Sequence, residues 1–288
     1  MELQYPLERR VIMSKFLLKI SSDVNIYPGY NLGYILGMEN YAICFDKYFS
    51  LDELKKIINK YPNESFFISL NRVIYEEELE NYKETLKKLD ELNLDGIIVG
   101  DLAALTYNLK TPLIIDQLHL NNSYLSINHY QNNNCGVFLS NDITLDEINE
   151  IRANTSAILL KQVFGHIHLS TSVRKLVTNY LTYFNKKLDN NTHFIKENNN
   201  GDEYIINEEY FGTHILTSKI LDLFEEIDKM NCDYYVIDTY LLDESIINDV
   251  VNAYVKKDVN LIYKVRNNIS TTKGFINKKT TYKVKNYE

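Results

Sequence analysis

Short apolar runs alternate with amphipathic segments along most of this chain. The runs are rich in Ile, Val, Leu and Phe and lie at residues 16–20, 41–45, 66–70, 96–100, 112–116, 135–139, 157–163 and 234–238. Each is almost continuously apolar, which is typical of strands buried on both faces of a parallel sheet. The segments between them predict helices, two of which begin with the capping-box pattern, at Ser50–Glu53 and Thr144–Glu147.

Alternating strands and helices of this kind fit a doubly wound sheet or a closed (β/α)8 barrel, and a count of eight strands favours the TIM-like barrel. The pattern breaks between Leu188 and His214, where an Asn-rich turn at 198–201 separates two short strand-like segments. This predicts a β-hairpin inserted between strands seven and eight. We expect an α/β barrel over residues 1–260, including the insertion 188–216, with a basic C-terminal tail over 261–288 that packs on it.

Charge and cysteine content narrow the functional classes. The formal net charge of −8 argues against a protein that wraps nucleic acid by bulk electrostatics, although a local basic patch remains compatible with it. No apolar run approaches the roughly 18 residues that span a bilayer, so we expect a cytoplasmic protein without membrane contact. The three cysteines, Cys44, Cys135 and Cys232, are too far apart for a CxxC metal site and predict buried thiols.

The segment after strand seven carries three candidate catalytic residues, because reacting groups in a parallel barrel lie at the C-terminal ends of its strands. Ser172 and His168 could form a nucleophile and base, although Ser172 could equally cap the helix that follows it. Arg174 could bind a carboxylate or phosphate, or pair with Asp142 or Glu208. The spacing does not require a metal on His168, and we expect none.

Five further polar residues are candidate substrate contacts at the same end of the barrel. Asp101 could hold a substrate hydroxyl or cap its own helix. The others lie near the ends of strands or in the insertion: Asn71, Gln117, Glu208 and Asp238.

The sequence around strand seven, VFGHIHLSTSVRKLVTNYL at 163–181, resembles the signature of the collagenase-like peptidase family U32. Matching positions are Val163, Gly165, Ser172, Arg174, Asn179 and Tyr180. Three other segments resemble the family in the same order, FFISLN with EEELE at 66–80, LDGIIVGDLAAL at 94–105 and LSNDITLDEINEIR at 139–152, and the segment from 206 to 238 follows it closely. The resemblance covers about residues 66–256.

The resemblance implies one of two activities. The family includes proteins named as proteases and bacterial enzymes that install 5-hydroxyuridine at the wobble position of tRNA, with prephenate as oxygen donor. Many members bind an iron–sulfur cluster through four cysteines, but His168 and Lys175 stand at the first two of those positions here, so no cluster is expected in this chain.

Within the family, the chain most resembles the short, cluster-lacking subunit of bacterial tRNA hydroxylation systems. The matching pieces are Glu208–Ile215, Ile237–Asp238 and Gly274–Thr280. This implies prephenate as a possible co-substrate, and a longer iron–sulfur-bearing homologue and the tRNA anticodon loop as partners. A collagenase-like protease and a non-catalytic scaffold for the longer homologue are the alternatives.

Overall fold

The computed structural model describes residues 15–20, 26–27, 30–131, 135–187, 190–198 and 201–278. The last part of the predicted basic tail, residues 279–288, lies outside this range. So do the two central residues of the Asn-rich turn, 199 and 200.

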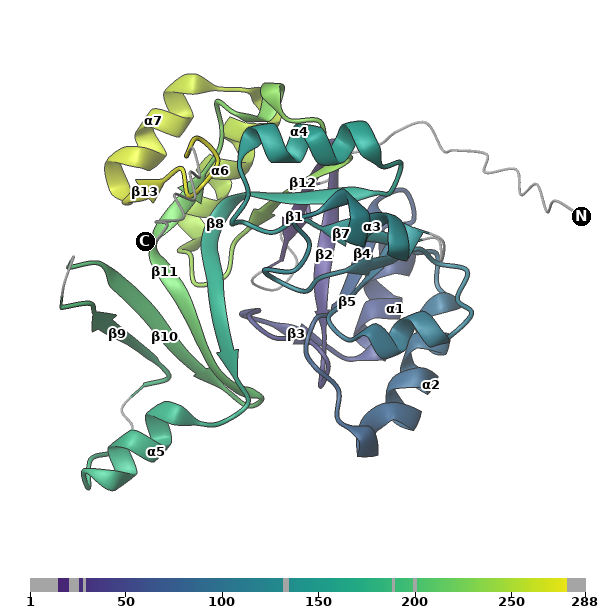
Figure 1. Cartoon of the computed structure of the whole chain (residues 1–288), viewed down its shortest axis with the longest axis horizontal. Coiled ribbons are helices and arrows are strands. Elements are labelled where there is room, and N and C mark those ends of the chain that lie inside the picture. The colour runs from purple at the N-terminus through teal and green to yellow at the C-terminus, as the bar shows by residue number, and fades with distance from the viewer. Residues whose placement is uncertain are drawn as a thin grey trace, which may run out of the picture.

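Eight parallel strands close into a barrel, as the sequence predicts (Figure 1). Each strand pairs with the next, and the last one pairs with both the seventh and the first, which closes the ring. The barrel strands are β1 (Phe16–Lys19), β2 (Leu32–Met38), β4 (Ser65–Leu70), β5 (Gly96–Val99), β6 (Leu113–Ile115), β7 (Cys135–Phe138), β8 (Leu159–Ser172) and β12 (Tyr234–Asp238). The short strand β3 (Tyr48–Phe49) pairs with the end of β2.

Helices cover the outside of the ring. They are α1 (Leu51–Lys60), α2 (Leu79–Asp90), α3 (Tyr124–Gln131), α4 (Leu145–Asn154), α6 (Glu244–Lys256) and α7 (Val259–Asn268), with 3-10 turns η1 (Glu76–Glu78) and η2 (Leu102–Thr106). Both predicted capping boxes form, Ser50 with Glu53 and Thr144 with Glu147. These caps satisfy backbone N–H groups at the starts of α1 and α4.

Strand alternation decides which residues reach the barrel mouth. Leu17 and Val236 belong to the small apolar cluster inside the ring, whereas Leu18 and Ile237 belong to the larger core between sheet and helices. The next residues along, Lys19 and Asp238, face the interior again, at the ends of their strands. Polar side chains at this level therefore line the mouth.

The second barrel strand is not the predicted one. The apolar run 41–45 is a loop after β2, and the strand is the glycine-containing segment Leu32–Met38. A Cβ on Gly33 would lie 2.6 Å from Leu17 Cδ2, and one on Gly37 would lie 2.8 Å from the Phe45 ring. Both glycines are therefore required by close packing inside the strand, although in a sequence they read as strand breakers.

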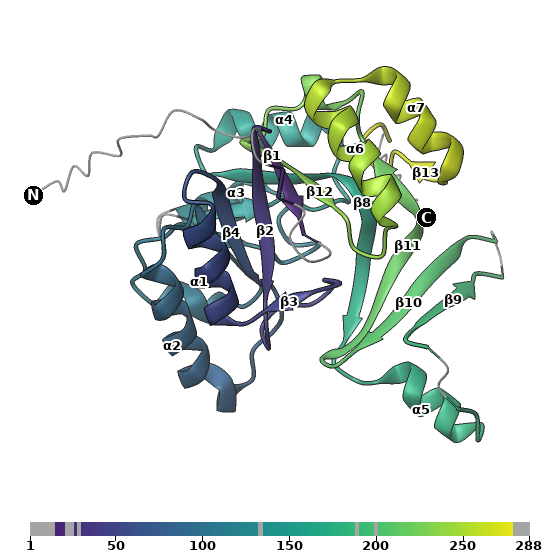
Figure 2. The ribbon, with the colours of Figure 1, turned by 180° about the vertical axis from the view of Figure 1, so that it is seen from behind.

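Strand β8 continues past the barrel and becomes one edge of an antiparallel sheet. There it pairs with β11 (Gly212–Asp222), which pairs with β10 (Glu203–Glu209), and β10 pairs with β9 (Thr192–Lys196). Helix α5 (Leu176–Tyr183) connects β8 to β9, and the turn η3 (Ile227–Lys229) leads back to β12. Figures 1 and 2 show this sheet and α5 projecting from the barrel as an arm.

The C-terminal segment folds onto the barrel and the base of the arm. The boundary that we drew after residue 260 falls inside α7, and strand β13 (Thr271–Thr272) pairs with β11. Three of its four described cations are bonded to carboxylates: Arg266 to Asp222 and Glu225, Lys273 to Glu225 and Glu226, and Lys264 to Asp249. The fourth, Lys278, lies over the ring of Phe275. Within the described ranges, no helix is long and apolar enough to cross a membrane.

Candidate functional site

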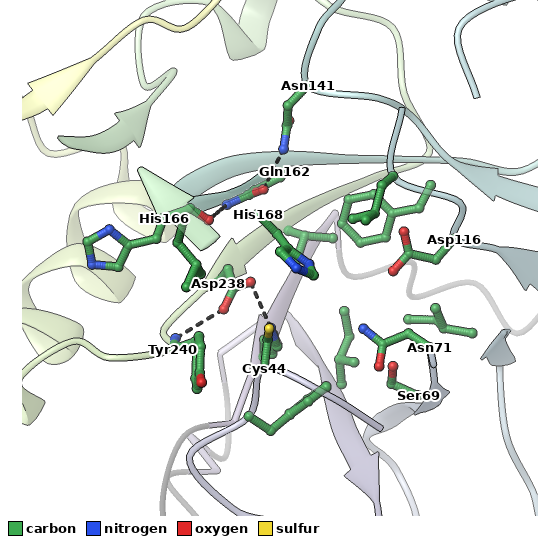
Figure 3. A pocket seen from close by; sticks show the side chains of 18 of the residues that line it. Cys44, Ser69, Asn71, Asp116, Asn141, Gln162, His166, His168, Asp238 and Tyr240 are labelled. Carbon is green, nitrogen blue, oxygen red and sulfur yellow. Dashed lines mark hydrogen bonds and ion pairs between the residues drawn. The ribbon is translucent and has the colours of Figure 1, made fainter. Parts of the chain in front are cut away.

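A pocket of about 780 Å³, including the part open to solvent, occupies the C-terminal mouth of the barrel. Polar side chains from most of the strands converge on it (Figure 3). Among them are Lys19, Asn71, Asp116, Asn141, Gln162, His168 and Asp238. This is where barrels of this type carry their chemistry.

Lys19 and Asp238 form an ion pair of 2.8 Å across the seam that closes the barrel. They are register partners at the ends of β1 and β12, and Asp238 also accepts a hydrogen bond from Tyr240 N at 3.0 Å. Burial lowers the pKa of Lys19, but the Asp238 carboxylate and smaller contributions from Cys44 and Asp46 together outweigh burial, and the pKa is raised. The Lys19 ammonium is therefore charged at neutral pH.

Asp116 is the acid of the pocket whose protonation changes near neutrality. It follows β6, and burial raises its pKa to about 6, against hydrogen bonds from Leu118 N and the Asn71 side chain. Asn71 is itself held by a hydrogen bond of 2.9 Å from Ile43 N to its Oδ1. A carboxyl with such a pKa suits general acid–base chemistry.

Glu209 anchors a hydrogen-bond cluster beside the pocket. It accepts hydrogen bonds from the hydroxyls of Tyr48 and Tyr240 and, at 3.3 Å, from Cys44 N. Cys44 is buried, with a φ of 60° that non-glycine residues rarely adopt. Burial, followed by the Glu209 charge, raises the pKa of its thiol well above the ordinary value.

Two histidines lie against the same cluster, joined by one threonine. Thr171 Oγ1 is 2.8 Å from His168 Nε2 and 3.0 Å from His214 Nδ1. Burial, followed by the other imidazole, lowers the pKa of His168 to about 3, and burial lowers that of His214. Cys44, His168 and His214 each offer a ligand atom within 4.8 Å of the others, which makes them the metal-competent trio among the described residues.

The structure brings some of the sequence-predicted site residues together and separates others. Asn71, His168 and Asp238 line the mouth pocket. Ser172 and Arg174 lie on the arm, outside it, and Ser172 Oγ accepts a hydrogen bond from Arg174 N at 3.2 Å. Ser172 does not cap the following helix directly, because α5 begins at Leu176, and exposed Arg174 forms no ion pair with any described residue.

The other three predicted contacts have structural partners of their own. Asp101 caps η2, accepting from Ala103 N at 2.9 Å and also from Ile74 N at 3.0 Å. Glu208 accepts from Val177 N and Thr178 N at the start of α5, at 2.8 and 3.1 Å. Gln117 Oε1 accepts a hydrogen bond from the Tyr130 hydroxyl at 3.3 Å, and Gln117 lines an adjoining pocket that shares Asn71 and Asp116 with the mouth pocket.

Sequence reasoning missed Cys44, Glu209 and His214 as pocket neighbours. Cys44 lay in a run that we took for a strand, and the other two come from the insertion, which folds back over the mouth. The sequence did contain one indication of His214. It belongs to the GTHI segment, residues 212–215, which matches the family, but the match assigned no role to this histidine.

The cysteines do not fit an iron–sulfur cluster. Cys44 lies at the mouth, whereas Cys135 begins β7 and Cys232 precedes β12, both at the opposite end of the barrel. Three thiols at two ends of a barrel cannot ligate one four-cysteine cluster.

Fold and site together define a TIM-barrel protein with a polar mouth pocket overlain by an antiparallel arm. The chain belongs to peptidase family U32, whose model matches residues 34–286. It is 24% identical to tRNA hydroxylation protein P2 of Bacillus subtilis over 260 residues, covering 83% of this chain and 84% of that protein.

Two further relatives match a smaller share of this chain. An uncharacterized protease of Methanocaldococcus jannaschii, MJ0090, is 25% identical over 226 residues, which cover 68% of this chain and about half (54%) of that protein. The solved structure of the U32 peptidase Mk0906 superposes with a TM-score of 0.49 at 13% identity, covering 78% of this chain and 92% of that one.

Proposed function

We propose that this chain is a subunit of an enzyme that hydroxylates the wobble uridine of tRNA at carbon 5. The observation that carries the proposal is the similarity to tRNA hydroxylation protein P2, which extends over more than four fifths of both chains. The family model, which matches residues 34–286, includes the arm as well as most of the barrel, so the family match is not confined to a common scaffold.

The mouth pocket has the chemistry that a uracil ring needs. Asn141 Nδ2 donates to Gln162 Oε1 at 2.7 Å, and Gln162 Nε2 donates to His166 O at 2.9 Å, so an amide chain lines one wall. Asn71 and Asp116 line another. Amides and a carboxyl can pair with the N–H and carbonyl groups of a flipped-out base, as base-modifying enzymes do.

The arm offers a surface suited to single-stranded RNA. Its helix α5 and the residue after it expose three aromatic rings, Tyr180 (61%), Tyr183 (81%) and Phe184 (51%). Exposed cations flank them on both sides, namely Arg174, Lys175, Lys186 and Lys187. Exposed rings beside cations form stacking platforms for unpaired bases, as in an anticodon loop.

Prephenate as oxygen donor is part of the same proposal, and its two carboxylates need cationic partners. Lys19, bonded to Asp238, is a described cation of the mouth pocket, and His119, bonded to Asp142, is an imidazole whose pKa is raised by hydrogen bonds to the Leu169 carbonyl and Asp142. A carboxylate of prephenate would therefore replace Asp238 or Asp142 as the partner of Lys19 or His119. Isothermal titration calorimetry with prephenate, on the chain with and without its partner, would measure this binding.

A partner follows from the cysteines. Because this chain cannot hold the four-cysteine cluster, a cluster in the enzyme would belong to a longer homologue. Affinity purification from the native cell, followed by iron and sulfide analysis, tests this directly.

The decisive test is loss of the modified nucleoside. Deleting the gene should remove 5-hydroxyuridine-derived nucleosides from bulk tRNA, as measured by mass spectrometry. Complementation with the wild type or with Lys87→Ala, on the exposed face of α2, should restore them, and Asp116→Ala should not. Unchanged nucleosides in the deletion strain would overturn the proposal, and a failure of wild-type complementation would assign the loss to another gene.

A peptidase is the second candidate, favoured by the family's protease members and by Cys44 lying near His168. The pKa of the thiol is raised and that of the imidazole lowered, so both are neutral, the opposite of the thiolate–imidazolium pair of cysteine proteases. Cleavage of gelatin or casein by the purified chain, abolished in Cys44→Ser or Ser172→Ala, would rank the peptidase above the tRNA hydroxylase.

A non-catalytic scaffold is the remaining alternative. It would be favoured if a cluster-bearing homologue co-purified with the chain while cells carrying Asp116→Ala kept wild-type levels of the modified nucleosides.

A further inference from the structure

Three donor side chains from distant parts of the chain converge between the pocket and the arm. Cys44 comes from the loop after β2, His168 from β8 and His214 from β11, and their ligand atoms lie within 4.8 Å of one another. Figure 3 shows Cys44 and His168 directed toward one another inside the pocket. Zinc–ligand distances of about 2.0–2.3 Å in tetrahedral geometry put donor atoms roughly 3.5 Å apart, so closing the trio on one ion takes side-chain movements of about 1 Å.

His214 has a ring nitrogen that the protein alone leaves unsatisfied. The side chain is completely buried, and its Nε2 has no hydrogen-bond partner among the described residues. The nearest carboxylate oxygen, Glu209 Oε2, is 3.8 Å away, which is beyond hydrogen-bond distance. A buried ring nitrogen without a partner costs stability, and a metal ion would satisfy it.

Thr171 supplies the outer shell that metal-binding histidines need. Its Oγ1 can accept a ring N–H from both histidines, through His168 Nε2 and His214 Nδ1. Ser170 O lies 3.1 Å from the same His168 nitrogen. The Ser170 carbonyl accepts from His168 Nε2 and leaves His168 Nδ1 with a lone pair. When Thr171 accepts from His214 Nδ1, His214 Nε2 also has a lone pair free for an ion.

The donor set indicates which ion would bind. One sulfur and two imidazole nitrogens suit Zn²⁺ and, less tightly, Co²⁺ or Fe²⁺. Glu209 is occupied by two tyrosine hydroxyls and Cys44 N, so it leaves the fourth position to the pocket. Three protein ligands with one open position are the pattern of a reactive rather than a purely structural zinc site.

We propose that Cys44, His168 and His214 form a mononuclear site for a divalent ion, Zn²⁺ above all, with its open position facing the mouth pocket. Binding replaces the thiol proton: the ion forms a bond to the Cys44 sulfur, and one proton per ion passes to solvent. The sequence spacing predicted no metal, because the three ligands are brought together only by the closed barrel and the returning arm. The inference does not depend on the proposed function.

The test is a titration of the full-length, tag-free chain, stripped of metal by chelation, with Co²⁺ and then Zn²⁺. We expect one equivalent of Co²⁺ to give thiolate-to-cobalt charge-transfer absorption, and Zn²⁺ to abolish it by competition. Cys44→Ser should remove the absorption and weaken Zn²⁺ binding by at least about 100-fold, while Cys232→Ser, which alters a buried thiol at the other end of the barrel, should keep both.

Thr171→Val keeps the inference testable if a ligand variant fails to fold, because Thr171 is exposed and only its hydroxyl is removed. We expect it to lower Zn²⁺ affinity about 10- to 100-fold with unchanged circular dichroism. Absence of the charge-transfer band in the wild type, or the same band in Cys44→Ser, would overturn the site.

Discussion

At the scale of single residues, the barrel seam depends on the Lys19–Asp238 pair. Both side chains are largely buried, with 11% and 19% exposed. Asp238→Asn would leave the Lys19 ammonium without its counter-charge, and we expect the free energy of unfolding to fall by roughly 3 kcal/mol in urea titrations. Asp228→Asn, which breaks the exposed pair with Lys257, should lower the free energy of unfolding far less, because solvent screens an exposed pair. Equal losses would mean that the seam pair contributes no more than a surface pair.

Asp116 should make stability depend on pH in the opposite sense to an ordinary salt-bridged acid. Its folded-state pKa of about 6 lies above the unfolded value, which is about 3.9. The folded protein therefore holds a proton that the unfolded chain releases, and stability falls as pH rises from about 4 to 6. Asp116→Asn removes this penalty, so we expect a gain of about 1–2 kcal/mol at pH 7.5 and almost none at pH 4. Denaturant titrations at both pH values check this, with Asp52→Asn on the exposed face of α1 as the control.

The same scale explains which site residues a sequence can indicate. Asn71, Asp116 and Asp238 follow buried apolar runs, so their place at the strand ends was predictable. Cys44 was not, because its pocket position depends on a φ of 60° in a loop whose residues are as apolar as a strand. The hydrophobic pattern of a sequence does not indicate a positive φ at a single residue.

At the scale of elements, Glu208 connects the insertion to helix α5. Its carboxylate accepts two backbone N–H groups of the first turn and the Thr178 hydroxyl. Burial opposes ionisation, but these hydrogen bonds outweigh it and lower the pKa, so the stabilisation is present above the ordinary glutamate pKa and is lost as pH falls below it.

Removing this cap should destabilise one helix rather than the barrel. Glu208→Ala leaves the first-turn N–H groups without their acceptor, and we expect hydrogen exchange over 176–183 to accelerate by about 5- to 10-fold, equivalent to about 1 kcal/mol. Protection in β4 and β5 should not change. Glu203→Ala, at an exposed position on the same strand, is the matched control, and faster exchange throughout the barrel would contradict a local role.

Element prediction succeeded where apolar runs were uninterrupted and failed where packing required glycine. Seven of the eight predicted strands coincide with barrel strands. The exception, β2, contains Gly33 and Gly37, which make room for Leu17 and Phe45. This packing requirement arises only in the folded barrel, so it does not appear in the hydrophobic pattern of the sequence.

At the scale of the whole molecule, the sequence pattern predicted the barrel and a hairpin inserted between its last two strands, but not the continuation of β8 past the barrel to pair with β11. Closing eight parallel strands fixes the mouth, because βα connections place the strand ends at one side. The continuation of β8 to Ser172 carries its last residues beyond the pocket, a geometry set by pairing with β11. Ser172 and Arg174 therefore match the family signature while lying away from the mouth.

This separation predicts two distinguishable contributions of the arm to RNA binding. Arg174 and Lys175 would bind phosphates. Replacing both by Ala should weaken the binding of an anticodon stem-loop. It should also reduce the slope of log K against log salt concentration by about 1.4, because each neutralised single-strand phosphate contributes about 0.7 to that slope. Tyr180→Ala with Tyr183→Ala should weaken binding by about 1–3 kcal/mol per stacked base with an unchanged slope. Fluorescence anisotropy at several salt concentrations measures both effects, and Lys87→Ala with Lys88→Ala, exposed on α2 away from the arm, should change neither. If the aromatic variants lowered the slope as much as the cationic ones, or if the α2 variants weakened binding equally, the arm would not be the RNA-binding surface.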